Sequence, residues 1–133
     1  MRIVIVGAGK VGSTLAFQLV KEGHDIVVID TNEERINDLQ NMADIMTICG
    51  NGANEEILKE AEVDQSDILI AATSADEVNM LACFIARHIG AAKTIARVRS
   101  PEYRNQLEMM KDELGLSMIV NPERSAAHEI SRI

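Results

Sequence analysis

The chain has few aromatic, cysteine and basic residues, and each shortage narrows its possible functions. Of its 133 residues, 2% are aromatic and none is Trp, so a core must be built from Ile, Val, Leu, Ala and Met. Cys49 and Cys83 are neither a disulfide framework nor spaced as a metal or redox pair. We expect both to be small buried apolar residues. Thirteen basic against 21 acidic residues give a net charge of −8. That balance argues against a general nucleic-acid surface or an anionic-membrane surface.

Long apolar segments are also missing. The longest apolar runs fall far short of the ~20 residues that span a bilayer. The first residues predict a strand and not a signal peptide. We therefore expect a soluble protein of the reducing cytoplasm, without direct membrane insertion. Hydrophobic residues still make up 47%, which favours a folded chain over a disordered one. The length suits one domain, which we place at 1–133.

Strand-like and helix-like segments alternate along the chain. We predict strands at 2–6, 25–30, 45–49, 67–73, 93–98 and 117–120, with helices at 10–22, 33–41, 54–62, 74–89, 101–114 and from about 122 onward. Ser74 and Glu77 have capping-box spacing at the start of the fourth helix. Gly23 is placed to end the first helix in a left-handed conformation. The alternation predicts an α/β, Rossmann-like, doubly wound parallel sheet of six strands with helices on both faces. Right-handed crossovers give the strand order 3-2-1-4-5-6.

The first predicted strand runs into a glycine-rich turn that opens a helix. Each glycine of a G-x-G-x-x-G turn has a role: a sharp turn, close approach of the backbone to a pyrophosphate, and close helix–strand packing. The free N–H groups and the positive dipole end of the helix would then face an anion. Lys10 is able to reach a phosphate or carboxylate, or else is a solvated residue of the first helical turn. The turn consists of Gly7, Ala8, Gly9, Lys10, Val11 and Gly12.

An acidic residue ends the second predicted strand. Asp30 lies 18 positions past Gly12, near the ~20 expected for an acid that binds the ribose hydroxyls of a dinucleotide. Such a carboxylate would repel a 2′-phosphate, which favours NAD over NADP. The alternative is an acid that caps the next helix, where Thr31 and Asn32 are also candidate caps. We include Thr31 with Asp30 in the predicted site.

Small and polar residues follow the other strands. Ligands of doubly wound sheets bind beyond the carboxyl ends of the strands, where the strand order reverses. A second small-residue loop follows the third strand and would allow close approach to the adenine side of a nucleotide. Asn79, in the next helix, would either reach the site or lie at the surface. The residues that we predict to line the site here are Gly50, Asn51 and Gly52 after the third strand, and Ala72 and Thr73 after the fourth.

The fifth predicted strand ends in two arginines. A period of two places Arg97 and Arg99 on one face. Arg97 lies nearer the strand interior, where burial is costly without an anion. We predict that Arg97 contacts the ligand or forms an ion pair near the site, and that Arg99 lies at its rim.

Groups suited to catalysis are absent from the predicted strand ends. A dehydrogenase needs a proton donor near the nicotinamide. Tyr103 is followed four positions later by Leu107, so there is no Tyr-x-x-x-Lys pair, and His24, His88 and His128 lie away from the strand ends. The sequence therefore predicts a domain that binds a nucleotide without catalysing a reaction of it.

The fourth predicted helix contains seven successive apolar residues, 80–86. A helix with an apolar outer side is covered on that side too. Either it lies deep under neighbouring helices or it forms a subunit interface, a homodimer by default.

Taken together, these residues resemble the TrkA N-terminal domain family, also called RCK or KTN domains. The Ala-Ala-Thr and Ile-Ala-Arg segments are more specific than the glycines. The matching segments, which span nearly the whole chain, are Gly7 to Gly12, Glu22-Gly23-His24-Asp25, Val28-Ile29-Asp30, Ala71-Ala72-Thr73 with Asp76-Glu77-Val78-Asn79, Ile95-Ala96-Arg97-Val98 and Val120-Asn121-Pro122-Glu123.

The resemblance implies a regulatory role in potassium transport. It implies that NAD or NADH is the regulatory ligand, with ATP and ADP as competitors in parts of the family. It also implies dimers that assemble into rings beneath a potassium-conducting membrane transporter or channel subunit, so that the protein is cytoplasmic and meets the membrane only through its partner. The implied ligand positions are Gly7 to Val11, Asp30, the Gly50–Asn51 loop, Thr73 and Arg97.

Two departures from the family pattern bear on these expectations. Asn51 stands where the family usually has an acid, which changes the charge of that contact. Many members carry a further C-terminal regulatory lobe, whereas this chain ends at Ile133, as either a short protein or a fragment.

Three functional hypotheses follow. The first is a nucleotide-gated regulatory subunit that is not an enzyme. The second is the cofactor domain of an NAD-dependent dehydrogenase whose substrate domain is missing. The third is a structural assembly domain with a vestigial site.

Overall fold

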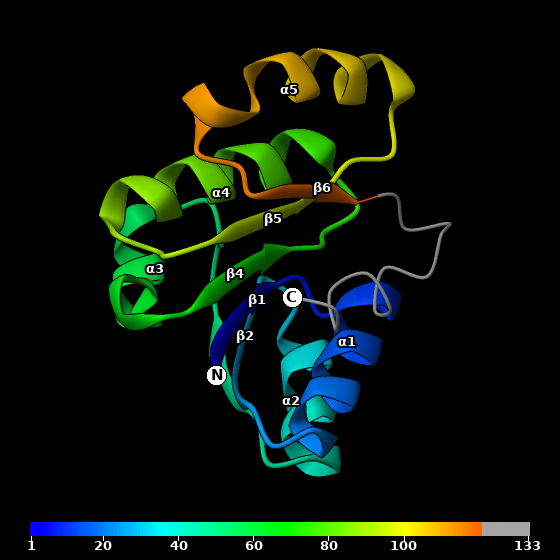
Figure 1. The fold of residues 1–133 in the computed structure, drawn as a ribbon. Coiled ribbons are helices and arrows are strands. Elements are labelled where there is room, and N and C mark those ends of the chain that lie inside the picture. The colour runs from blue at the N-terminus through cyan, green and yellow to red at the C-terminus, as the bar shows by residue number, and fades with distance from the viewer. Residues whose placement is uncertain (121–133) are drawn as a thin grey trace.

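The computed structural model describes residues 1–120, which form a parallel sheet with helices on both faces (Figure 1). The predicted strand order is confirmed: the sheet runs β3-β2-β1-β4-β5-β6 and all neighbouring strands are parallel. The strands are β1 (Arg2–Val6), β2 (Asp25–Asp30), β3 (Met46–Cys49), β4 (Ile68–Ala71), β5 (Thr94–Arg97) and β6 (Met118–Val120). The order reverses between β1 and β4, and that point defines where a ligand would lie.

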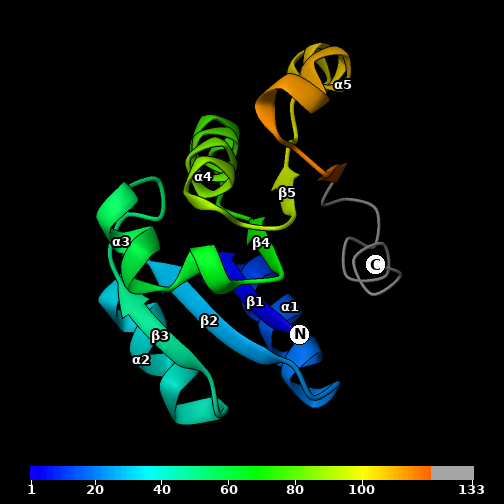
Figure 2. The ribbon, with the colours of Figure 1, turned by 60° about the vertical axis from the view of Figure 1, so that its left-hand side comes forward.

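The helices divide between the two faces of the sheet, as Figure 2 shows. One face carries α1 (Lys10–Lys21) and α2 (Glu33–Met42), and the other carries α3 (Glu55–Glu60), the 3₁₀ helix η1 (Val63–Gln65), α4 (Asp76–Ile89) and α5 (Pro101–Leu114). The helix predicted from about 122 lies outside the described residues.

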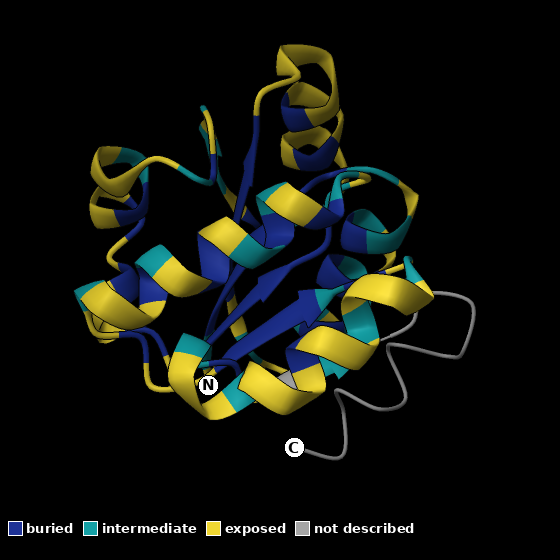
Figure 3. Ribbon diagram, turned by 90° about the horizontal axis from the view of Figure 1, so that it is seen from above, coloured by how far each residue is buried: buried dark blue, intermediate teal, exposed yellow. Residues whose placement is uncertain are grey.

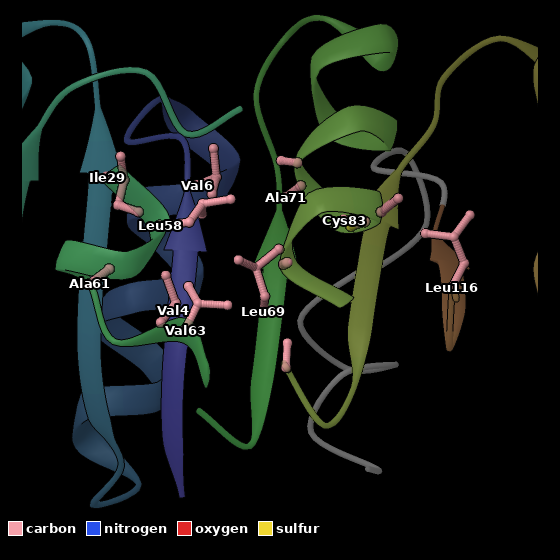
Figure 4. Packing of buried hydrophobic residues seen from close by; sticks show 14 of the residues in the cluster. Val4, Val6, Ile29, Leu58, Ala61, Val63, Leu69, Ala71, Cys83 and Leu116 are labelled. Carbon is pink, nitrogen blue, oxygen red and sulfur yellow. The ribbon is translucent and has the colours of Figure 1, made fainter. Parts of the chain in front are cut away.

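Both faces of the sheet are buried because β1, β2 and β4 are apolar at successive positions. In β1, Ile3 and Ile5 pack on the α1 side, while Val4 and Val6 pack on the α3–α4 side. This alternation follows from the period of two in a strand. Figure 3 shows the buried strands between helices whose outer sides are exposed, and Figure 4 shows the apolar cluster under α3 and α4, which includes Leu58 and Cys83.

The structure confirms one of the two predictions about the cysteines, and it corrects the other and the predicted start of the fourth helix. Cys83 is buried, as expected, but Cys49 is exposed because β3 is an edge strand with little cover. The capping box of Ser74 and Glu77 is wrong: α4 begins at Asp76 with Ala75 as its N-cap, and no side chain caps it. The turn is fixed instead by the Thr73 hydroxyl, which accepts from the Ala75 N–H at 3.2 Å.

Several predicted helix caps are confirmed, and several elements are shorter than predicted. Asn32, Asn54 and Ser100 cap their helices through side-chain oxygens. Gly23 has the predicted left-handed conformation, with φ +88°. The third helix ends at Glu60 instead of 62, and β4 ends at 71 instead of 73. The early end of β4 leaves residues 72 and 73 free to line the space above the sheet.

Candidate functional site

A cleft of about 540 Å³ lies beyond the carboxyl ends of the central strands. It sits at the point where the strand order reverses, the expected ligand site of this architecture. Most of the predicted site residues line it together, although they come from five separate segments of the chain. The lining residues are Val6, Gly7, Gly9, Lys10, Val11, Ile29, Asp30, Thr31, Arg35, Gly50, Asn51, Gly52, Ala72, Thr73, Ser74, Ala75, Val78 and Arg97.

The glycine turn forms one wall of the cleft. Gly7 has φ +112°, and a Cβ there would stand 2.9 Å from the Ala72 carbonyl oxygen, so both conformation and space require glycine. A Cβ on Gly12 would overlap the Gly7 carbonyl oxygen, so Gly12 serves packing of α1 and does not line the cleft. Gly9 is the N-cap of α1, without a side-chain cap and without an acid in the first turn. The N-terminus of α1 therefore has free N–H groups at the cleft, an arrangement suited to an anion.

Asp30 stands almost buried beside this turn, with 8% of its side chain exposed. One carboxylate oxygen accepts from the Ala8 N–H at 2.6 Å and the other from the Asn32 N–H at 2.7 Å. Asp30 thus also contacts the start of α2, as the alternative prediction had it, but it does so through the backbone N–H of the N-cap residue Asn32. Ala8, a predicted site residue, does not line the cleft: it is buried in the core cluster on the α1 side, and its N–H donates to Asp30. Since each carboxylate oxygen has two lone-pair directions, Asp30 retains acceptor capacity for ribose hydroxyls.

The loop after β3 closes the cleft on the β2 side. The Asn51 side-chain oxygen accepts from the Ala53 N–H at 2.9 Å. A Cβ on Gly52 would overlap the Val6 side chain, and one on Gly50 would lie 2.7 Å from the Ile57 side chain. The two glycines therefore let this loop lie flat against β1 and α3.

Asn79 occupies neither of its two predicted positions. It is fully buried and does not line the cleft. Its amide nitrogen donates to the Thr73 carbonyl at 3.0 Å and to the Arg97 carbonyl at 2.8 Å. Its oxygen accepts from the Thr73 N–H at 2.9 Å and the Thr73 hydroxyl at 2.7 Å. Asn79 thus holds two cleft residues in place from behind, because it joins the ends of β4 and β5 to the first turn of α4.

Arg97 lines the cleft as a cation without a carboxylate partner among residues 1–120. One terminal nitrogen donates to the Thr73 carbonyl at 3.0 Å, while its buried Nε has no hydrogen-bond partner in this part of the chain. Burial lowers the pKa of Arg97, and the positive charge of Arg99 lowers that pKa further, against the opposing effect of Asp76. A cation of this kind is suited to an anionic ligand group.

Arg99 does not line the cleft itself, and its place at the rim stays a prediction. β5 ends at Arg97, so the period of two does not extend to Arg99, which is exposed. It lines a neighbouring open depression with Asp76 and Tyr103, and this depression shares Ser74 and Ala75 with the cleft. The Asp76 carboxylate accepts from the backbone N–H groups of Arg99 and Ser100, each at 2.9 Å, and so fixes the β5–α5 turn.

Sequence reasoning missed Arg35, which also lines the cleft. Its guanidinium nitrogen lies 3.7 Å from an Asp30 carboxylate oxygen, and 55% of its side chain is exposed. The one available signal was its place in the first turn of α2, three residues after the Asn32 cap.

The cleft holds binding groups and few candidates for catalysis. Its titratable lining residues are Lys10, Asp30, Arg35 and Arg97. His24 contacts the amino terminus and His88 lies in the last turn of α4; neither lines the cleft, and His128 lies outside the described residues. Within residues 1–120 there is no group of three His, Cys, Asp or Glu residues arranged to hold a metal ion. Nor does this part of the chain contain a helix with the length and hydropathy of a membrane span.

The fold and the cleft define a doubly wound α/β domain of the dinucleotide-binding type. The TrkA-N domain family matches the chain over residues 3–122. The chain therefore belongs to the TrkA-N domain family, which confirms the resemblance drawn from its motifs.

Known proteins support the same placement. The chain is 35% identical over 133 residues to a Trk system potassium uptake protein TrkA homolog of Methanothermobacter thermautotrophicus, and the match covers all of this chain but 60% of that relative. It resembles the crystal structure of the TrkA-N domain of inner membrane protein ybaL from Escherichia coli with a TM-score of 0.80, at 26% identity over 98% of this chain and 94% of that one.

A channel structure shares the fold at lower identity. The GsuK channel bound to NAD matches with a TM-score of 0.76 at 23% identity, over 90% of this chain and 21% of that one. At this identity the likeness shows the fold alone.

Proposed function

We propose that the cleft binds an adenosine nucleotide, NAD or NADH in the first place, with ATP or ADP as competitors. The observation that carries the proposal is that one cleft is lined by a carboxylate and by two anion-binding features that have no anionic partner among residues 1–120. Among residues 1–120, Arg97 has no carboxylate partner and the α1 N-terminus has no side-chain cap, while Asp30 lies almost buried beside the glycine turn. Phosphates suit the first two, and ribose hydroxyls suit the third.

Each end of the ligand has its set of residues in this proposal. The pyrophosphate lies over Gly7, Gly9 and Val11, where Lys10 and Arg97 supply positive charge. The adenosine ribose bonds to Asp30 beside Thr31, and the adenine lies along the Gly50, Asn51 and Gly52 loop. Ala72 and Thr73 form the floor between them.

We further propose that the domain regulates a potassium transport system in the cytoplasm, at the membrane only through a potassium-conducting transporter or channel subunit. The supporting observations are family membership and a named Trk system relative, of which the chain spans 60%. Regulation requires that the nucleotide bind one assembly state more tightly than another.

A surface for assembly is available on α4. The deep-burial alternative for its apolar run is wrong within the described chain, since Leu81 is 50% exposed and Phe84 48% exposed. We propose that this face joins a second copy of the chain in a homodimer or ring. Phe84→Glu should then convert a dimer into a monomer in sedimentation at micromolar concentration, while the exposed Met42 of α2, changed to Glu, should not. A wild-type monomer would contradict the interface.

The full-length gene product tests the regulatory role against the dehydrogenase alternative. In potassium-depleted cells, wild-type protein should support potassium uptake, and Asp30→Ala should impair it at equal protein level. No NADH should be consumed when candidate alcohols, hydroxy acids or carbonyl substrates are supplied. Substrate-dependent NADH turnover would favour the dehydrogenase. Unchanged uptake with Asp30→Ala, together with no nucleotide binding at millimolar ligand, would favour a structural domain with a vestigial site.

A further inference from the structure

Among the described residues that line the cleft, Arg35 is the one charged residue without a part in the proposed binding scheme. It stands in the first turn of α2, where the cleft opens beside Asp30 and Thr31. A guanidinium nitrogen lies 3.7 Å from the Asp30 carboxylate and 3.8 Å from the place of a Cβ on Gly9. The guanidinium therefore lies between the ribose-binding carboxylate and the glycine turn.

The donors of Arg35 are available to a ligand. Among residues 1–120 its side chain makes one ion pair and no hydrogen bond, and that ion pair is longer than a hydrogen bond. A guanidinium offers five N–H donors in a planar fork that matches a phosphate. With 55% of the side chain exposed, Arg35 can turn toward a bound group without leaving a buried void.

The local charge changes what the ribose pocket accepts. A lone carboxylate at the end of β2 repels a phosphate on the adenosine ribose, whereas an arginine nearby accommodates one. In this cleft the two groups lie 3.7 Å apart, so the positive charge of Arg35 offsets the negative charge of Asp30.

We propose that Arg35 is a specificity-determining residue that lets the cleft accept an adenosine nucleotide with a phosphate on its ribose. The proposal rests on the proposed nucleotide site. It modifies the expectation from Asp30 alone, under which a 2′-phosphate is excluded.

Two probes that differ by one phosphate test the proposal. AMP and adenosine 2′,5′-bisphosphate are titrated into the full chain at one fixed ionic strength, and the ratio of their dissociation constants is measured. The wild type should bind both with a ratio within about tenfold. Arg35→Gln should raise the ratio in favour of AMP by roughly tenfold or more, the effect of one charge-assisted hydrogen bond. Arg35→Lys keeps the positive charge, so its ratio of dissociation constants should lie close to that of the wild type.

A matched control separates this effect from net charge. Lys21 is exposed in the last turn of α1 and does not line the cleft. Lys21→Gln removes the same charge and should leave the ratio unchanged. Wild-type protein that binds AMP but not the bisphosphate overturns the proposal, and so does an Arg35→Gln variant with an unchanged ratio. Wild-type protein that binds neither probe overturns the nucleotide site itself.

Discussion

Replacement of Arg97 by methionine should weaken nucleotide binding and should change the free energy of unfolding only a little. Methionine keeps an unbranched apolar stem that reaches to the position of Nε, but it removes the charge and the hydrogen bond to the Thr73 carbonyl. That bond, from a charged donor, contributes about 1.5–3 kcal/mol, and the unpartnered buried Nε costs about 1–3 kcal/mol. The two effects oppose each other, so the free energy of unfolding should change by no more than about 2 kcal/mol.

For nucleotide binding, no second effect offsets the loss of the Arg97 charge. Arg97→Met removes a charged contact to the ligand phosphate, worth about 1.5–3 kcal/mol, or roughly 10- to 150-fold in the dissociation constant. Urea denaturation measures the first quantity, and calorimetric titration with NAD measures the second. A variant that is destabilised by more than about 3 kcal/mol, yet binds NAD with unchanged affinity when folded, would refute the reasoning and make Arg97 a structural residue.

Further predictions concern the carboxylate, the buried amide and the two thiols. Asp30→Ala should weaken NAD binding by ~1.5–3 kcal/mol in calorimetry while the fold survives; unchanged affinity would remove Asp30 from the ribose. Asn79→Ala should lower the free energy of unfolding by roughly 1–3 kcal/mol, because it leaves buried backbone groups unpaired, and should also weaken NAD binding; a variant as stable as the wild type would contradict the described hydrogen bonds. Burial raises the pKa of the Cys83 thiol to about 12, so a thiol reagent at pH 8 should label Cys49 alone until urea unfolds the chain. Two labelled thiols in the folded protein would contradict the burial of Cys83.

The sheet could be predicted from the sequence because few physical rules determine it. Apolar runs such as that of β1 require cover on both faces, and right-handed crossovers leave few strand orders. The spacing of Asp30 from Gly12 and the position of Arg97 at a strand end placed both residues at one edge of the sheet. These predictions used local pattern and topology only.

The hydrogen-bond and ion-pair partners of the site side chains could not be predicted from the sequence because they depend on tertiary contacts. The spacing of Asp30 says nothing of its bond to the Ala8 N–H, which joins two segments 22 residues apart. Asn79 was expected at the cleft or the surface, but its burial depends on how α4 packs over β4 and β5. Arg35 was missed because the orientation of the first turn of α2 toward the cleft is set by the β2–α2 turn.

The fourth helix shows how a local motif can mislead. Ser74 and Glu77 have the spacing of a capping box, but the Thr73 hydroxyl and the Asn79 amide set the turn before them. Hydrogen bonds within residues 73–79 thus take the place of a side-chain cap, which is worth about 1 kcal/mol.

Calorimetric titration of the purified chain with NAD tests the central claim most directly. The cleft described above predicts saturable binding of one NAD per chain, which ADP added beforehand should diminish by competition for the same site. Absence of any heat of binding up to millimolar NAD and ADP would contradict the assignment of this cleft as a nucleotide site.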